Sequence, residues 1–193
     1  MEKPELKLDF HPVTPERWKD LEKLFGPRGA IGGCWCMWWR IKRADFEHQQ
    51  GDGNHEAMCS IIESGKVPGI LAYSKGEVVA WCSVAPREDY PVLDRSPKLK
   101  RVDDQPVWSI VCFFIAKAYR HRGLSSKVLQ GAIEYATQQG AQIVEGYPIE
   151  PKKDRTPDIY AFTGMASTFK KLGFKEVARR SKSRPIMRYY IEQ

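Results

Sequence analysis

Residues 119–126 carry the side chains best suited to bind a charged ligand, in the order Tyr-Arg-His-Arg-Gly-Leu-Ser-Ser. The apolar, β-branched and aromatic residues 107–115 precede them and predict a buried strand. Apolar residues at helical spacing follow them and predict a helix from Leu124 to a stop at Gly140. Such a turn points free backbone N–H groups and the positive end of the helix dipole at one spot. The sequence therefore predicts a pyrophosphate-binding turn, surrounded by the basic side chains Arg120, His121, Arg122 and Lys127.

Two common phosphate-binding patterns do not fit this turn. The dinucleotide fingerprint Gly-x-Gly-x-x-Gly and the P-loop Gly-x4-Gly-Lys-Ser/Thr are both missing from the sequence. Arg120-x-x-Gly123-x-Ser125 instead resembles the Arg/Gln-x-x-Gly-x-Gly/Ala turn of the GNAT N-acetyltransferase superfamily, which binds the pyrophosphate of acetyl-CoA. Ser125 replaces the usual glycine or alanine, and serine is both small and a good helix cap.

The resemblance extends along most of the chain and implies a fold. It implies one domain over residues 1–193, an α/β (α+β) GNAT fold with a twisted, mostly antiparallel mixed sheet of about seven strands flanked by helices. It also implies acetyl-CoA as cosubstrate, bound by the strand and the turn. The expected contacts are Phe113, Phe114, Ile115, Arg120, His121, Arg122, Gly123, Leu124, Ser125 and Ser126.

The other expected elements agree with that order. Strands are expected at 6–10, 141–149, 175–180 and 185–191, and a hairpin at 69–84. Helices are expected at 14–24 and 54–64, and another before the Gly-Phe pair at 173–174. The polar, proline-containing residues 87–105 are expected to form a long loop.

Acetyl transfer to an amine needs a neutral amine, a stabilised oxyanion and a proton for the departing thiolate. The resemblance places oxyanion-stabilising N–H groups near residues 113–115. The polar side chains that the family often uses are missing, because Phe169 replaces its tyrosine and Ser109 replaces its strand glutamate. Ser109 is itself a candidate catalytic residue, because it stands at that strand position. Its asparagine also has no counterpart near Phe162 and Thr163.

Replacement catalytic groups are expected on and after the strand that follows the turn helix. Glu145 is the candidate base, because a carboxylate in an apolar strand needs a partner or a cleft. Its other interpretation is an ion pair. Tyr147 and Tyr160 are candidate acids, since a phenol of pKa ~10 can protonate a thiolate. Core packing of both rings is the alternative.

An aromatic cluster between the first two helices is the candidate acceptor site. Trp35, Trp38 and Trp39 are candidates to bind a planar or cationic acceptor, or else to form part of the core. Arg40 is a candidate to bind a substrate carboxylate, or else a solvated side chain.

Composition limits the remaining possibilities. The net charge of +7 suits a polyanion such as CoA, although it also favours solubility. Five cysteines, with no signal peptide and no apolar run near the ~20 residues of a membrane span, predict a cytoplasmic protein with reduced thiols. No metal site is expected, since Cys34-Trp-Cys36 lacks a second ligand pair. No nucleic-acid recognition motif is present, and a monomer or homodimer is expected.

The leading hypothesis is an acetyl-CoA-dependent N-acetyltransferase that acts by direct attack of a primary amine on the thioester. The expected partners are a CoA thioester and a small or amino-acid-like amine. Two alternatives stay open: a non-catalytic acyl-CoA-binding regulatory module, and an N-acetyltransferase of proteins or peptides. The loss of tyrosine at Phe169 is the best support for the first alternative.

Overall fold

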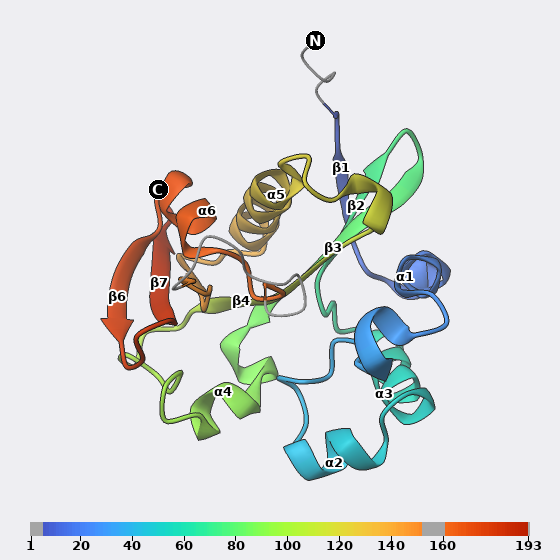
Figure 1. The fold of residues 1–193 in the computed structure, drawn as a ribbon, viewed down its shortest axis with the longest axis horizontal. Helices are drawn as coiled ribbons and strands as arrows, with labels where there is room; N and C mark the ends of the chain where they lie inside the picture. The colour runs from blue at the N-terminus through green and yellow to red at the C-terminus, as the bar shows by residue number, and fades with distance from the viewer. Residues whose placement is uncertain (1–5, 152–160, 193) are drawn as a thin grey trace.

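The computed structural model describes residues 6–151 and 161–192 and contains one mixed sheet (Figure 1). The candidate acid Tyr160 lies outside the described residues. The strands are β1 (Asp9–Pro12), β2 (Ile70–Ser74), β3 (Glu77–Pro86), β4 (Trp108–Ile115), β5 (Ile143–Gly146), β6 (Lys175–Arg179) and β7 (Pro185–Tyr190). The helices are α1 (Trp18–Phe25), α2 (Arg43–His48), α3 (Asp52–Glu63), α4 (Pro91–Arg95), α5 (Leu124–Gln138) and α6 (Ala166–Lys171).

The seven strands are ordered β1-β2-β3-β4-β5-β7-β6, and every neighbouring pair except β4 and β5 is antiparallel. This arrangement confirms the predicted mixed, mostly antiparallel sheet with flanking helices. The parallel β4–β5 pair requires a crossover, and α5 supplies it. The predicted turn therefore lies at the carboxyl end of β4, where the crossover begins.

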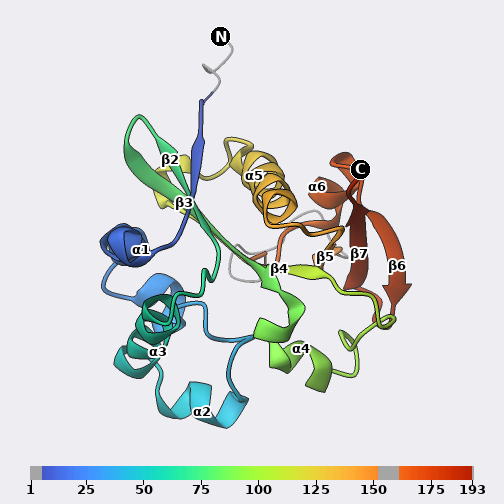
Figure 2. The ribbon, with the colours of Figure 1, turned by 180° about the vertical axis from the view of Figure 1, so that it is seen from behind.

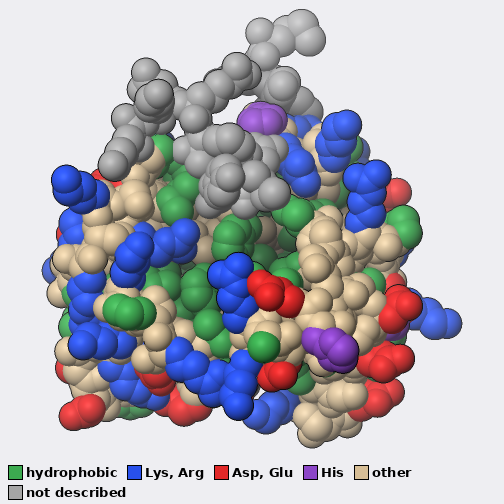
Figure 3. Space-filling model, turned by 60° about the horizontal axis from the view of Figure 1, so that its bottom comes forward, with side chains coloured by type: hydrophobic (Ala, Val, Ile, Leu, Met, Phe, Trp, Pro, Cys, Tyr) green, Lys and Arg blue, Asp and Glu red, His purple; other side chains and the backbone are tan. Residues whose placement is uncertain are grey.

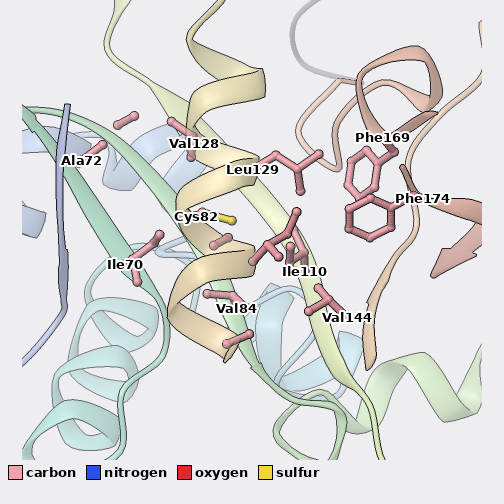
Figure 4. Packing of buried hydrophobic residues seen from close by; sticks show 14 of the residues in the cluster. Ile70, Ala72, Cys82, Val84, Ile110, Val128, Leu129, Val144, Phe169 and Phe174 are labelled. Carbon is pink, nitrogen blue, oxygen red and sulfur yellow. The ribbon is translucent and has the colours of Figure 1, made fainter. Parts of the chain in front are cut away.

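Helices α5 and α6 cover one face of the sheet and bury the largest apolar cluster (Figures 1, 2 and 4). Apolar residues of α5 such as Val128 and Leu129 pack onto Cys82, Val84 and Ile110 of the central strands. Burying such side chains stabilises a protein by about 1.5–3 kcal/mol each. The contact is close, because a Cβ added at Gly131 would lie 2.7 Å from the ring of Phe10.

The opposite face of the sheet carries two further clusters. Helices α1 and α3, together with the segment between α1 and α2, cover Leu71 and Trp81. The second cluster lies under α4 and the chain after it, against Ala85, Val111 and Ile186. The two clusters meet at Trp38 and Cys112, which contact both.

Two short helices differ from the expectations. Residues 87–105, expected to be a loop, contain a 3-10 turn and α4, in which Pro91 occupies the first turn and Leu93 is fully buried. Residues 43–48 form α2, which buries Phe46 against Trp38. Both helices are too short to show a clear helical period in the sequence. None of the helices in the described part of the chain is long and apolar enough to cross a membrane.

Candidate active site

Strand β4 separates from β5 halfway along its length. The two strands pair only from Trp108↔Val144 to Ile110↔Gly146, although β4 continues to Ile115. A bulge begins the separation, because Ser83 of β3 opposes Cys112 and Val84 opposes Ile110, which leaves Val111 as the extra residue. Bulges bend the strand that carries them. The carboxyl half of β4 therefore has an edge that β5 does not cover.

The backbone groups on this edge belong to Phe113 and Ile115. Ala116 N–H donates to the Val79 carbonyl across the β3–β4 ladder, so by strand alternation Phe113 and Ile115 face the other side. Phe113 N–H donates to the Phe162 carbonyl at 2.6 Å. The Ile115 carbonyl accepts a hydrogen bond from Arg120 Nε at 2.9 Å.

The turn after β4 has two residues in the left-handed region of backbone conformation. His121 and Gly123 both have positive φ, 57° and 74°, and Gly123 is the N-cap of α5. The first N–H groups of α5 have no partner within the helix, and they point out of its N-terminus. The Cβ position of Gly123 is open, with no atom within 4 Å, so the backbone conformation rather than crowding favours glycine there.

The β4 edge and the turn share one pocket of about 210 Å³. Its walls come from the edge, the turn, the segment before α6 and the loop after α1. The lining residues are Ile31, Phe113, Phe114, Ile115, Arg120, His121, Ser125, Ala161, Phe162, Gly164 and Met165. The structure thus brings together six of the ten residues expected to contact acetyl-CoA.

The other four residues expected to contact acetyl-CoA do not line this pocket. Gly123 shapes the turn, and Leu124 is a core residue that is 2% exposed. Arg122 lies over the ring of Tyr119, with Cζ 5.6 Å from the ring centroid. Ser126 lines a separate open groove beside Lys127.

One buried network joins three candidate catalytic groups: Ser109 of β4, Glu145 of β5 and Tyr147, which follows β5. Glu145, 1% exposed, accepts hydrogen bonds from Arg87 Nη1 at 2.9 Å, Arg188 Nε at 2.7 Å and the Tyr147 hydroxyl at 2.6 Å. Ser109 Oγ lies 2.8 Å from the same hydroxyl. The structure therefore agrees with the ion-pair interpretation of Glu145, because its two carboxylate oxygens accept hydrogen bonds from three donors, two of which are arginines.

Burial in this network also changes the proton affinity of Tyr147. Desolvation raises the pKa of the Tyr147 hydroxyl well above its usual value, and the Glu145 charge raises it further. The ring is fully buried, as is Ser109. None of Glu145, Tyr147 and Ser109 lines the pocket. Their hydrogen bonds instead link β4, β5 and Arg188 of β7 beside the point where β4 and β5 separate.

The three tryptophans do not gather at one pocket. Trp35 packs against Trp18, Phe25 and His55, with ring centroids 5.9, 5.7 and 4.4 Å away. Trp38 and Trp39 follow Trp35 in the sequence. Their two rings meet edge to face, with centroids 6.4 Å apart. Trp35 and Cys36 both have positive φ, 44° and 59°. The backbone therefore turns between Trp35 and Trp38, and their rings contact different neighbours.

Arg40 is part of the core, which contradicts the idea of a solvated side chain. It is 8% exposed, and its Nη2 donates to the Pro68 carbonyl at 2.9 Å and the Tyr90 hydroxyl at 3.1 Å. Its guanidinium also lies 4.4 Å from the centroid of the Tyr90 ring. These contacts hold Arg40 away from the pocket, so it is poorly placed to bind a substrate carboxylate.

Phe169 occupies the position where a tyrosine was expected. Its ring is fully buried between Phe113 and Phe174, with centroids at 6.2 and 4.8 Å. A Cβ at Gly146 would lie 2.2 Å from this ring, so the glycine makes the packing possible. The position adjoins the β4 edge, but it supplies no proton.

Two residues of this region were missed by the sequence analysis as functional candidates. Phe162 places its carbonyl on the Phe113 amide, and Arg184 reaches Thr163 from the β6–β7 turn. The basic run at residues 179–184 was a signal for the second, but its position in the fold could not be known.

The surface on the α2 and α4 side is hollowed in the middle (Figure 3). Hydrophobic side chains show in the hollow, and Lys and Arg side chains gather on the β6–β7 side of it. In residues 6–151 and 161–192, no group of three or more His, Cys, Asp or Glu side chains could hold a metal ion.

The sheet thus separates beside the N-terminus of α5, at the carboxyl end of β4. The sequence model of the acetyltransferase (GNAT) family matches residues 35–151, which is more than half of the chain. The chain belongs to this family and is an acetyltransferase that uses acetyl-CoA. No curated protein matches it in sequence.

Solved structures share the fold at low sequence identity. A GNAT-family acetyltransferase from Streptococcus agalactiae has a TM-score of 0.57 and 15% identity, covering 98% of this chain and all of that one. The PaiA N-acetyltransferase from Thermoplasma acidophilum, in complex with coenzyme A, has a TM-score of 0.52 and 12% identity, with 96% and 100% coverage. Aminoglycoside N-acetyltransferase AAC(6')-Iy in complex with CoA has a TM-score of 0.54 and 15% identity, with 100% and 99% coverage.

Proposed function

We propose that the protein transfers an acetyl group from acetyl-CoA to the primary amine of a small or amino-acid-like acceptor by direct attack on the thioester. The observation that carries this proposal is the shared pocket between the β4 edge and the turn that begins α5. Its volume of about 210 Å³ lies below the roughly 300–1,000 Å³ of many ligand pockets, which favours a small group near the reacting atoms.

The residues of the pocket have separate tasks in this proposal. The N-terminal amides of α5 and the turn at Gly123 bind the pyrophosphate. Arg120, tied to the Ile115 carbonyl, adds positive charge between the turn and the strand. One of the two edge amides, that of Phe113 or that of Ile115, binds the thioester oxygen and stabilises its developing negative charge. One oxygen cannot bind both, because alternate residues of a strand lie about 6.6 Å apart.

The β4 edge is closed at one of these amides. The Phe162 carbonyl must leave Phe113 N–H before a thioester oxygen can take its place, since one N–H makes one good hydrogen bond. No buried acid or base of the β4–β5 network reaches the pocket. Orientation of the amine therefore carries much of the rate, and it can supply roughly 7–11 kcal/mol.

The test is release of free CoA thiol with a panel of amines, together with calorimetric binding of acetyl-CoA. Binding with amine-dependent thiol release supports the proposal. Binding without turnover on any amine, including peptides, selects the regulatory module, for which Phe169 is the specific observation. Turnover on peptides alone selects the protein acetyltransferase, and absence of acetyl-CoA binding contradicts all three.

A further inference from the structure

Arg184 differs from the other arginines near the point where β4 and β5 separate. Arg87 is paired with Glu145 and Asp94, and Arg188 is paired with Glu145 and Asp103. Across residues 6–151 and 161–192, no carboxylate pairs with Arg184. It is nevertheless half-buried, and a partly desolvated cation gains more from an anion than an exposed one does.

Arg184 does not line the pocket itself, but both of its hydrogen-bond partners lie beside the candidate active site. Nη1 donates to the Tyr147 carbonyl at 3.2 Å, and Tyr147 follows Gly146, the last residue of β5 that pairs with β4. The same Nη1 lies 3.2 Å from Thr163 Oγ1. Thr163 stands between Phe162 and Gly164, which both line the pocket.

Only one nitrogen of the guanidinium makes these contacts. Arginine has five N–H donors in a planar fork, and the fork matches the two oxygens of a carboxylate. The Nη2 and Nε groups of Arg184 make no hydrogen bond within the described residues. Burial without a carboxylate partner also lowers the pKa of the guanidinium.

We infer that Arg184 binds the acid group of the acceptor, so that the preferred acceptor is an amine that also carries a carboxylate. This inference rests on the proposed function. Arg184 would hold the carboxylate beside the pocket while the amine reaches past Phe162 to the β4 edge. The gathering of Lys and Arg side chains on the β6–β7 side of the hollow agrees with an anionic acceptor (Figure 3).

The test compares acceptors that differ only in the acid group. Each standard amino acid and its carboxamide are assayed for kcat/KM by thiol release, with wild type, Arg184→Gln and Arg184→Lys. Arg180→Gln is the matched control, because this arginine of the same turn donates instead to the carbonyls of Lys100 and Arg101. Thermal melts confirm that each variant is folded.

The inference predicts that wild type prefers an acid over its carboxamide. Arg184→Gln should lose about tenfold to hundredfold in kcat/KM on the acid and much less on the carboxamide. Arg184→Lys should recover part of the loss, and KM for acetyl-CoA should not change. Equal losses on acid and carboxamide, or a wild-type preference for carboxamides, would overturn it.

A binding measurement keeps the inference separate from the proposed function. Amino acids and carboxamides are titrated into the protein with CoA present, and binding is followed by calorimetry. Acid-selective binding that Arg184→Gln abolishes would support the inference even if no amine is acetylated. Binding that ignores the acid group would overturn it, whatever the turnover.

Discussion

A charge placed on the turn at Gly123 tests the pyrophosphate site most directly. The matched variants are Gly123→Asn and Gly123→Asp, which have nearly the same size. Asparagine and aspartate both tolerate the left-handed conformation at φ 74° better than most residues do. No atom lies within 4 Å of an added Cβ, so both variants have room for this first side-chain atom. The two variants therefore differ mainly in charge.

The size of the effect follows from Coulomb's law. Two unit charges about 4 Å apart repel by about 1 kcal/mol in water and about 4 kcal/mol at an effective dielectric constant near 20. If the α5 N-terminus binds pyrophosphate, Gly123→Asp should bind acetyl-CoA roughly 5-fold to 1000-fold more weakly than Gly123→Asn.

Calorimetric titration of acetyl-CoA at low and high salt measures this difference. The gap should narrow at high salt, because the Debye length falls from about 10 Å at 0.1 M to about 3 Å at 1 M. Thermal melts of both variants check that they fold equally well. Equal affinities of the two folded variants at low salt would refute the pyrophosphate assignment.

Three further predictions concern the scaffold. Phe169→Ala should destabilise the protein by about 3–5 kcal/mol, seen as a lower urea midpoint, because it leaves a cavity in a fully buried site; an unchanged midpoint would contradict the packing described. Glu145→Gln should also cost about 3–5 kcal/mol in urea unfolding, since it leaves Arg87 and Arg188 without their shared carboxylate, while KM for acetyl-CoA of the folded enzyme stays unchanged. Asp103→Asn should be less stable than wild type at neutral pH. Arg188 lowers the pKa of Asp103 from 3.8 to about 2, so the difference should disappear as pH falls from about 4 through about 2; a difference that persists at the lowest pH would exclude this ion pair as its source.

The turn and its two flanking elements could be predicted from the sequence because the signals there are local. The apolar run before residue 119 and the helical spacing after Leu124 each lie within one segment. Gly123 indicates a tight turn between the strand and the helix, and it has a positive φ in the structure. Most of the other strands also follow from short apolar runs and turn residues.

The surroundings of the candidate acids could not be predicted, because their partners are distant in the chain. Arg87 is 58 residues from Glu145, and Arg188 is 43 residues away. Nothing in the apolar strand around Glu145 indicates which cations will meet it. Arg40 and Arg184 illustrate the same limit, since Arg40 contacts Tyr90 in the core and Arg184 contacts Tyr147 and Thr163.

The Phe162 carbonyl, which accepts the hydrogen bond of Phe113 N–H, competes with any ligand oxygen for this amide. A ligand oxygen that takes this amide exchanges one protein hydrogen bond for another, so the exchange by itself contributes little net affinity. The measured Kd then equals the intrinsic value divided by the fraction of molecules in which the amide is free. With the thioester bound as proposed above, a substitution near Phe162 that changes this fraction would change the Kd for acetyl-CoA, without any change at Phe113 itself.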